Sequence, residues 1–203
     1  MEFDKFFLDA VLRWGHIMAG IIWIGHLYFF NFVNGAMQAK LDGETKKKVN
    51  PQLMWRTLFW FRWGAMFTLI LGLCLFVNHW WFIKDYKNVV TGELSGRALW
   101  IMIGMTMGIV MWFNVWFIIW PAQQKIVPAV AKGEKPPEGL PARAALFSRI
   151  NTYLSGPMLF CMVFGAHATQ KFNAVLFALL LVVGLAAIHL FIKSGPKVGV
   201  WQD

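Results

Sequence analysis

Acidic side chains are scarce in this chain of 203 residues, and none falls inside a long apolar stretch. There are ten Asp and Glu residues against nineteen Lys and Arg, and we expect all ten in loops or terminal segments. Proton pumps and cation transporters need carboxylates buried in the membrane, and carboxylate-bridged metal centres need them inside a helical bundle. The shortage of acids argues against these classes and leaves histidine, arginine and methionine for interior chemistry.

Cysteine is almost absent as well. Cys74 and Cys161 both fall in the middle of apolar stretches, where we expect neither a structural disulfide nor a thiolate. The sequence has no Cys-x-x-Cys-His motif, which excludes covalent attachment of haem. A basic segment is also missing at the N-terminus, which carries three acids, so we expect no cleavable signal peptide.

Hydrophobic residues, by contrast, make up 58% of the chain, and the mean hydropathy is +0.54. A membrane span needs about 20 predominantly apolar residues. Five segments meet this length, at about 14–34, 57–83, 98–121, 152–170 and 172–192. We therefore predict an all-α integral membrane bundle of about five transmembrane helices, which forms a single domain over residues 1–203.

The net charge of +9 is divided between the two sides of this expected bundle. Twelve basic residues fall on one side: Lys40, Lys46, Lys47, Lys48, Arg56, Lys125, Lys132, Lys135, Arg143, Arg149, Lys193 and Lys197. Six fall on the other: Lys5, Arg13, Lys84, Lys87, Arg97 and Lys171. The positive-inside rule then places the N-terminus outside and the C-terminus in the cytoplasm. Membrane orientation accounts for this excess of basic residues, so it does not indicate a nucleic-acid partner.

Two histidines, His16 and His167, lie in different apolar segments near the same side of the membrane. His16 is three residues past Arg13 and His167 four before Lys171, so each should lie roughly 5 Å inside the boundary. An ionisable residue inside a membrane marks a candidate functional site. Two imidazoles at one depth can ligate one iron, so we predict a non-covalent haem b between them. The alternative is a pair of interfacial histidines bonded to water or carbonyl groups.

The residues around this pair suit a flat cofactor. Gly20 is one turn and Trp23 two turns from His16 on the same helical face, and the glycine leaves room for a ring. Phe160 and Phe164 share a face with the second histidine, where they form either a wall of the site or ordinary packing. Without a buried acid, we expect a backbone carbonyl, a hydroxyl or a water to hold the second ring N–H of each ligand.

The other three histidines are weaker candidates. His26 and His189 could bind a second haem, although their expected depths differ, at roughly 20 Å and 27 Å. Otherwise His26 is a buried polar group and His189 lies near the cytoplasmic headgroups. His79 is expected at a solvated interface beside an aromatic belt and is the reserve ligand.

Arginine and methionine offer less. Arg62 interrupts the second span and either faces the bundle or extends to the cytoplasmic headgroups, where a haem propionate would be its functional partner. The eleven methionines suggest Cu(I), but four of them lie in an apolar segment without histidine, so core packing is the better interpretation. Gly104 and Gly108 form a G-x-x-x-G pattern that predicts close helix packing.

Several strings occur together in order: Arg13-Trp14-Gly15-His16, Ala19-Gly20-Ile21-Ile22-Trp23-Ile24-Gly25, Tyr28-Phe29-Phe30-Asn31-Phe32-Val33, Phe61-Arg62-Trp63-Gly64-Ala65, Trp112-Phe113-Asn114-Val115-Trp116, Ile119-Trp120-Pro121 and Ser148-Arg149-Ile150-Asn151-Thr152-Tyr153-Leu154-Ser155. From about residue 13 to 168 the chain resembles the N-terminal membrane domain of the bacterial membrane-bound urate oxidase family. The opening His-x(6)-Trp-x-Gly is also similar to that of the copper-resistance D family and of a membrane protoporphyrinogen oxidase with haem b.

The resemblance implies a helical domain of the bacterial inner membrane, with His16 and His167 at family positions. Full-length members continue into a c-type cytochrome domain, which these 203 residues do not include. His26 stands where the family has a small residue, so the resemblance implies no second haem. No catalytic residue for urate carries over.

Three functions follow as hypotheses. The first is an electron carrier that passes electrons from haem b to a c-type cytochrome on the outer side. The second is a cofactor-free accessory subunit of a larger respiratory complex, with small-residue faces for docking to other subunits or to a second copy. The third is urate oxidation within the bundle, which ranks lowest because few charged groups are available there to bind an anionic purine.

Overall fold

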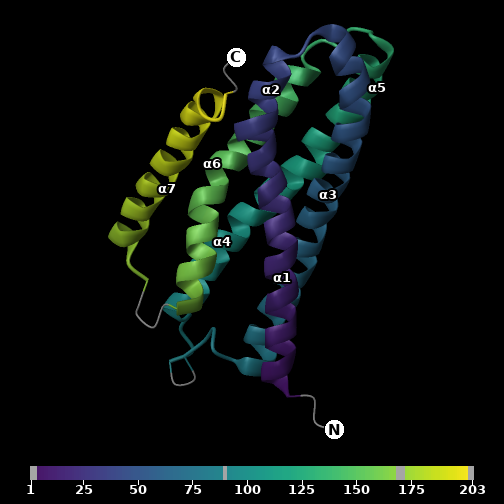
Figure 1. The fold of residues 1–203 in the computed structure, drawn as a ribbon. Helices are drawn as coiled ribbons and strands as arrows, with labels where there is room; N and C mark the ends of the chain where they lie inside the picture. The colour runs from purple at the N-terminus through teal and green to yellow at the C-terminus, as the bar shows by residue number, and fades with distance from the viewer. Residues whose placement is uncertain (1–3, 89–90, 168–171, 201–203) are drawn as a thin grey trace.

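The computed structural model describes residues 4–88, 91–167 and 172–200, which form an all-helical bundle (Figure 1). Five long helical rods run along it. The first rod joins α1 Lys5–Tyr28, a π-helical segment Phe29–Asn34 and α2 Gly35–Lys40, and the second joins α3 Gly43–Val77 and a π-helical segment Asn78–Ile83. The third joins α4 Gly96–Phe113, a π-helical segment Asn114–Ile119 and α5 Trp120–Lys132. The fourth rod is α6 Leu140–His167, and the fifth is α7 Ala174–Ser194 with the 3-10 turn Gly195–Lys197. The N- and C-termini lie at opposite ends of the bundle (Figure 1).

Four of the rods begin at a side-chain cap. Asp4, Asp42, Ser95 and Asn173 precede α1, α3, α4 and α7, and the side chain of each accepts a backbone N–H from the first turn of its helix. The first N–H groups of a helix have no partner within the helix, so these residue types favour a helix start. The short loop between the second and third rods is closed by an isolated antiparallel bridge between Lys87 and Leu94.

The rods pack as two pairs, α1 with α3 and α4 with α6, and α7 lies on the outer side of α6 (Figure 1). Glycines bring the backbones close, as is usual for helices in membranes. A Cβ at Gly64 of α3 would lie 3.0 Å from the backbone nitrogen of Trp23 in α1, and one at Gly104 of α4 would lie 2.9 Å from the Cβ of Cys161 in α6. The two pairs therefore each have a seam that admits only a small residue.

Polar side chains join α6 to α1 and to the third rod at the centre of the bundle. The hydroxyl of Tyr28 in α1 lies 3.0 Å from Ser155 Oγ in α6. Asn114 Nδ2 donates to Asn151 Oδ1 at 2.8 Å, and Asn151 Nδ2 donates to the carbonyl of Met111 at 2.9 Å. Buried amides that satisfy one another in this way fix the register of α6 against the rest of the bundle.

The all-α prediction is confirmed, and four rods are long and apolar enough to cross a membrane. They are Lys5–Lys40, Gly43–Ile83, Gly96–Lys132 and Ala174–Lys197. The predicted fourth span, 152–170, corresponds to α6, which begins earlier at Leu140 and is not among the four. Residues 168–170 of that span lie outside the described residues. Four rods, α6 among them, extend well past the predicted spans because polar helical turns continue them beyond the apolar stretch.

The expectation that every acid lies in a loop or terminal segment is wrong for Asp9. This residue lies in the second turn of α1, and its side chain is only 15% exposed. The predicted span begins at residue 14, but α1 begins at Lys5 because Asp4 caps it. The helix therefore carries one carboxylate into the packed end of the bundle.

Candidate cofactor site

His16 lies on the inward face of α1, the face that carries the buried residues Trp23 and Leu27 farther along. Its Nδ1 lies 2.9 Å from the carbonyl oxygen of Thr68 in α3, and since a carbonyl only accepts, Nδ1–H is the donor. The ring rests against Gly72, where an added Cβ would come within 2.9 Å of ring carbon Cε1. Within the described residues Nε2 has no hydrogen-bond partner, so its lone pair is free.

Gly20 provides open space one helical turn from His16. A Cβ added at Gly20 would meet no heavy atom within 4 Å. Trp23, nearly a turn farther along, is 2% exposed and belongs to the apolar core, although its indole N–H has no partner among the described residues. Of the two predicted neighbours, the glycine leaves room beside the histidine and the tryptophan packs at the bundle centre.

His167 lies at the same depth in the bundle as His16. The antiparallel helices α1 and α6 are joined by the hydrogen bond between Tyr28 and Ser155. His16 is twelve residues before Tyr28, and His167 is twelve residues after Ser155. At about 1.5 Å per residue, both histidines lie roughly 18 Å from that hydrogen bond, toward the same end of the bundle.

The two rings nevertheless point in different directions. The buried side of α6 includes Ser155, Met158 and Gly165, and His167 follows Gly165 by two residues, about 200° around the helix. His167 is exposed, and its Nδ1–H donates to the carbonyl of Val163 at 2.8 Å. The structure therefore brings His16 and His167 to one depth but does not bring them into contact.

The phenylalanines near His167 pack against another residue. The ring centroids of Phe160 and Phe164 lie 6.1 Å and 4.8 Å from that of the buried Trp100 in α4. Phe177 of α7 contacts the same indole at 5.7 Å. These aromatic side chains join α4, α6 and α7. In this structure Phe160 and Phe164 therefore take part in helix packing, the second of the two roles considered for them.

His26 and His189 do not face each other. His26 Nδ1–H donates to the carbonyl of Ile22 at 2.7 Å, and its place two residues before Tyr28 turns it about 200° away from α6. His189 is exposed on α7, and its Nδ1 lies 2.8 Å from the hydroxyl of Tyr153. The structure therefore does not bring this candidate pair together.

His79 is buried rather than solvated, which corrects the expectation for this residue. It is 4% exposed at the end of the second rod. Its Nδ1 lies 2.9 Å from Asp85 Oδ1 and its Nε2 lies 2.9 Å from Asp9 Oδ1. Arg97 and Arg13 pair with the other oxygens of these carboxylates, each at 2.7 Å. With both nitrogens engaged, His79 has none free for iron in this arrangement.

The charge cluster around His79 consists of Asp9, Arg13, His79, Asp85 and Arg97. Nδ1 of the histidine keeps its proton, because the neighbouring carboxylate only accepts. Nε2 lies between Asp9 and the Arg13 guanidinium, whose Nη2 is 3.2 Å away. Tyr86 stacks on the ring at 5.1 Å, and burial raises the pKa of its hydroxyl to about 12. The sequence signal for this cluster was the i, i+4 spacing of Asp9 and Arg13.

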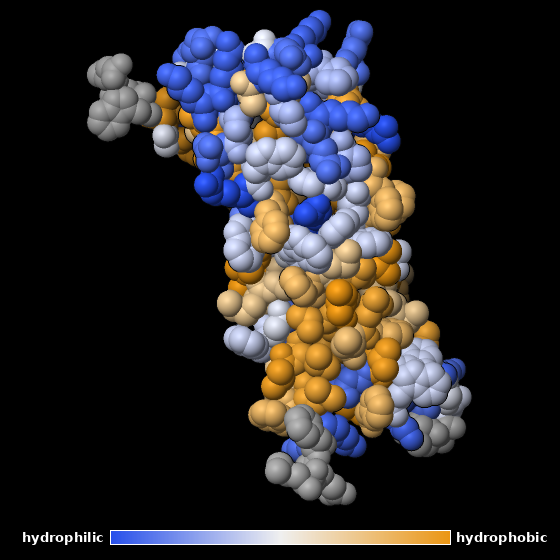
Figure 2. Space-filling model, turned by 90° about the vertical axis from the view of Figure 1, so that its right-hand side faces the viewer, coloured by the Kyte–Doolittle hydropathy of each residue, from blue (hydrophilic) through white to orange (hydrophobic). Residues whose placement is uncertain are grey.

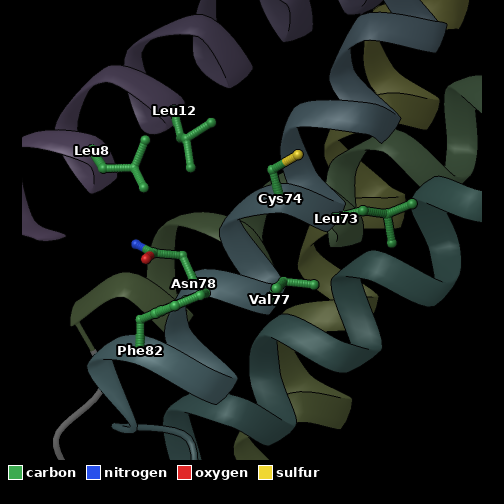
Figure 3. A pocket seen from close by; sticks show the side chains of 7 residues that line it. All are labelled: Leu8, Leu12, Leu73, Cys74, Val77, Asn78 and Phe82. Atoms are coloured by element: carbon green, nitrogen blue, oxygen red, sulfur yellow. The ribbon is translucent and has the colours of Figure 1, made fainter. Parts of the chain in front are cut away.

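A hollow of about 390 Å³ opens beside the charge cluster, between α1 and the second rod (Figure 3). Its lining is almost entirely apolar and comprises Leu8, Leu12, Leu73, Cys74, Val77, Asn78 and Phe82. In Figure 3 the amide of Asn78 points toward Leu8 on α1. Neither His16 nor His167 lines this hollow, so it is separate from the predicted ligands.

The donor chemistry of His16 fits a haem iron, since Nδ1–H is held by a carbonyl and Nε2 is free to coordinate. His167 has the same arrangement and the same depth but faces outward. Among the described residues, no group of three or more His, Cys, Asp and Glu side chains converges as a metal site. A metal bound here would therefore depend on histidine pairs.

No curated protein and no solved structure matches this chain. One family model, described as urate oxidase N-terminal, matches residues 81–201. This range includes His167 and His189, whereas His16, His26 and His79 precede it. It covers more than half of the chain, and the sequence motifs noted above point to the same family. The chain therefore belongs to the urate oxidase N-terminal family.

Proposed function

We propose that this protein binds haem b in the membrane and passes electrons toward a c-type cytochrome. The observation that carries the proposal is the state of His16, which faces the bundle interior with Nδ1 anchored to Thr68 and Nε2 free. Open space at Gly20 lies one turn away. A haem with two imidazole ligands supplies one-electron transfer, since its iron has no position left for oxygen.

His167 would be the second residue that holds the haem. Equal depth on antiparallel helices supports it, together with a free Nε2. His167 is the last residue of α6, and the proposal requires this end of the helix to turn inward. The residues of the chain have three tasks here: Thr68 orients one ligand, Gly20 leaves room, and the apolar core keeps water out.

We further propose that α6 crosses the membrane as a fifth span, with the N-terminus outside. The termini lie at opposite ends of the bundle, which requires an odd number of crossings (Figure 1). The four apolar rods give an even number without α6. The uneven division of basic residues supports the orientation, with the twelve-residue side in the cytoplasm of a bacterial inner membrane.

The reduced-minus-oxidised visible spectrum of protein purified from haem-sufficient cells tests this function. We expect a low-spin b-type spectrum and a pigment that acid–acetone extracts. His16→Ala and His167→Ala should each abolish the spectrum or make it high-spin, since each removes an axial ligand. His79→Ala, His26→Ala and His189→Ala are the matched controls and should leave it low-spin.

Two outcomes would contradict the proposal. If the protein shows no Soret band, the accessory-subunit hypothesis replaces it. If both the His16 and the His167 variant keep the wild-type spectrum, the ligand assignment is wrong. Loss of half the haem in the His26 and His189 variants would instead reveal a second haem. The family name makes urate the first electron donor to test, with c-type cytochrome as acceptor.

A further inference from the structure

Arg62 of α3 lies in a cage of three tryptophans. Its guanidinium carbon Cζ is 3.9 Å from the ring centroid of Trp120, 5.1 Å from that of Trp116 and 5.8 Å from that of Trp63. The cage is fixed by its own contacts, since Trp63 meets Trp116 edge-on at 5.6 Å. Cation–π attraction holds an arginine against such rings and leaves the N–H groups in its plane available.

This arginine has no counter-charge among the residues that the structure describes. The ion pairs of the described residues involve Arg13, Lys47, His79 and Arg97, and Arg62 takes part in none of them. Its Nε is buried without a hydrogen-bond partner. Arginine can only donate, and a charged donor left unpaired in a packed structure calls for an acceptor.

A neighbouring donor is unpaired as well. The indole Nε1 of Trp116, in the same cage, is buried and has no partner. Tryptophan, like arginine, offers no acceptor. Both donor-only groups, one from α3 and one from the third rod, belong to the same cage, and neither has an oxygen as partner among the described residues. The group that fits them is an oxyanion.

The cage lies where the apolar part of the bundle meets its basic end. Trp120 stands at the end of the apolar stretch 98–121, and Arg62 is five residues inside the stretch 57–83. On the side of the molecule that Figure 2 shows, a pale band separates the hydrophilic end from the hydrophobic body. Bulky aromatic side chains at such a boundary sit at the level of the lipid headgroups.

The surface next to the cage also suits a lipid. A shallow hollow of about 420 Å³ on α3 is lined by Trp55, Arg56, Phe59 and Trp60. Trp55 contacts Trp120 of the cage at 5.5 Å between ring centroids. An apolar chain can lie along these exposed rings while its headgroup reaches Arg62. A free phosphate would gain nothing from them.

We propose that Arg62 and its tryptophan cage bind the phosphate of a membrane phospholipid on the basic side of the bundle. The guanidinium donates to the phosphate oxygens, and the aromatic surface of α3 supports the acyl chains. The site is separate from the proposed haem ligand His16, which contacts Thr68 farther along α3.

Native mass spectrometry of the purified protein, titrated with phosphatidylglycerol, tests this site. Arg62→Gln should weaken lipid retention by about tenfold, as expected for loss of a charge-assisted hydrogen bond. Arg143→Gln is the matched control, because Arg143 is an exposed arginine in the first turn of α6 and belongs neither to the cage nor to the hollow. It should retain lipid as the wild type does.

Arg62→Lys keeps the charge if the Gln variant does not fold, and it should bind more weakly than the wild type because lysine lacks the planar fork. Equal retention by the wild type and both Arg62 variants would overturn the proposal. Displacement of the lipid by millimolar inorganic phosphate would overturn it in favour of a free-phosphate site. The haem spectrum reports separately on the proposed function and should be unchanged in all three variants.

Discussion

The histidines of this protein differ in the hydrogen-bond partners of their two ring nitrogens. In His16, His26 and His167 Nδ1–H donates to a backbone carbonyl and Nε2 has no partner among the described residues. In His79 both nitrogens face carboxylates. The first arrangement suits coordination of a metal, whereas the second suits an ion-pair network that fastens a loop to the helices.

The charge cluster should therefore contribute to stability. His79→Phe keeps the stacking on Tyr86 but removes the hydrogen bonds of His79 to Asp9 and Asp85, and a hydrogen bond to a charged group contributes about 1.5–3 kcal/mol. We expect this loss in the free energy of unfolding, measured in detergent.

His26→Phe is the control for this measurement, because His26 bonds only to a carbonyl of its own helix. It should change the stability by less than about 1 kcal/mol. Equal stability of the two variants would show that the charge cluster contributes nothing to folding.

At the scale of helices, the G-x-x-x-G pattern of α4 divides into two unlike positions. A Cβ at Gly104 would lie 2.9 Å from Cys161 Cβ and 3.4 Å from the carbonyl oxygen of Met158, whereas a Cβ at Gly108 would meet nothing within 4 Å. The sequence pattern predicts close packing at both positions. Only the first lies in the seam between α4 and α6.

Gly104→Ala should destabilise the protein by about 1–3 kcal/mol, because the added methyl group forces α4 and α6 apart. Gly108→Ala is the matched control and should be neutral or stabilising by about 0.5–1 kcal/mol, since alanine favours a helix. Chemical unfolding in detergent measures both. A larger loss in the Gly108 variant would contradict the packing of α4 described here.

The sequence predicted the elements that depend on local composition. Apolar stretches located four of the rods. For the ring N–H of His16 the lack of nearby acids left a carbonyl, a hydroxyl or a water as acceptor, and in the structure it is the carbonyl of Thr68. Helical turns beyond the membrane boundary carry no hydropathy signal, so the full lengths of α1 and α6 were missed. The position of His79 depends on its contacts with Asp9 of α1 and with Asp85 of the following loop, and a sequence pattern cannot show such contacts.

The same distinction applies to the candidate site. Counting residues from a boundary gave equal depths for His16 and His167, because a helix rises by a fixed amount per residue. The direction of each ring depends on how α6 is rotated against its neighbours, which the central Asn114–Asn151 pair and Gly104 determine. Tertiary contacts of this kind involve residues far apart in the sequence.

At the scale of the whole molecule, the bundle has one basic and one less basic end, and its termini lie at opposite ends (Figure 1). Five crossings explain both features if α6 spans the membrane. Its polar residues do not oppose this, because Asn151, Thr152 and Ser155 are fully buried against other helices and are shielded from lipid. A helix whose polar face is covered by protein can cross with a lower overall hydropathy.

Single-cysteine labelling tests this topology in a cysteine-free variant. Glu93→Cys lies in the loop between the second and third rods, Glu138→Cys lies between α5 and α6, and Lys197→Cys follows α7. In intact spheroplasts a membrane-impermeant maleimide should label only the first, because the other two lie on the side with twelve basic residues. All three should react after permeabilisation, which controls for accessibility. If α6 does not cross, Glu138→Cys and Lys197→Cys will label from opposite sides of the membrane, and the five-span arrangement is then wrong.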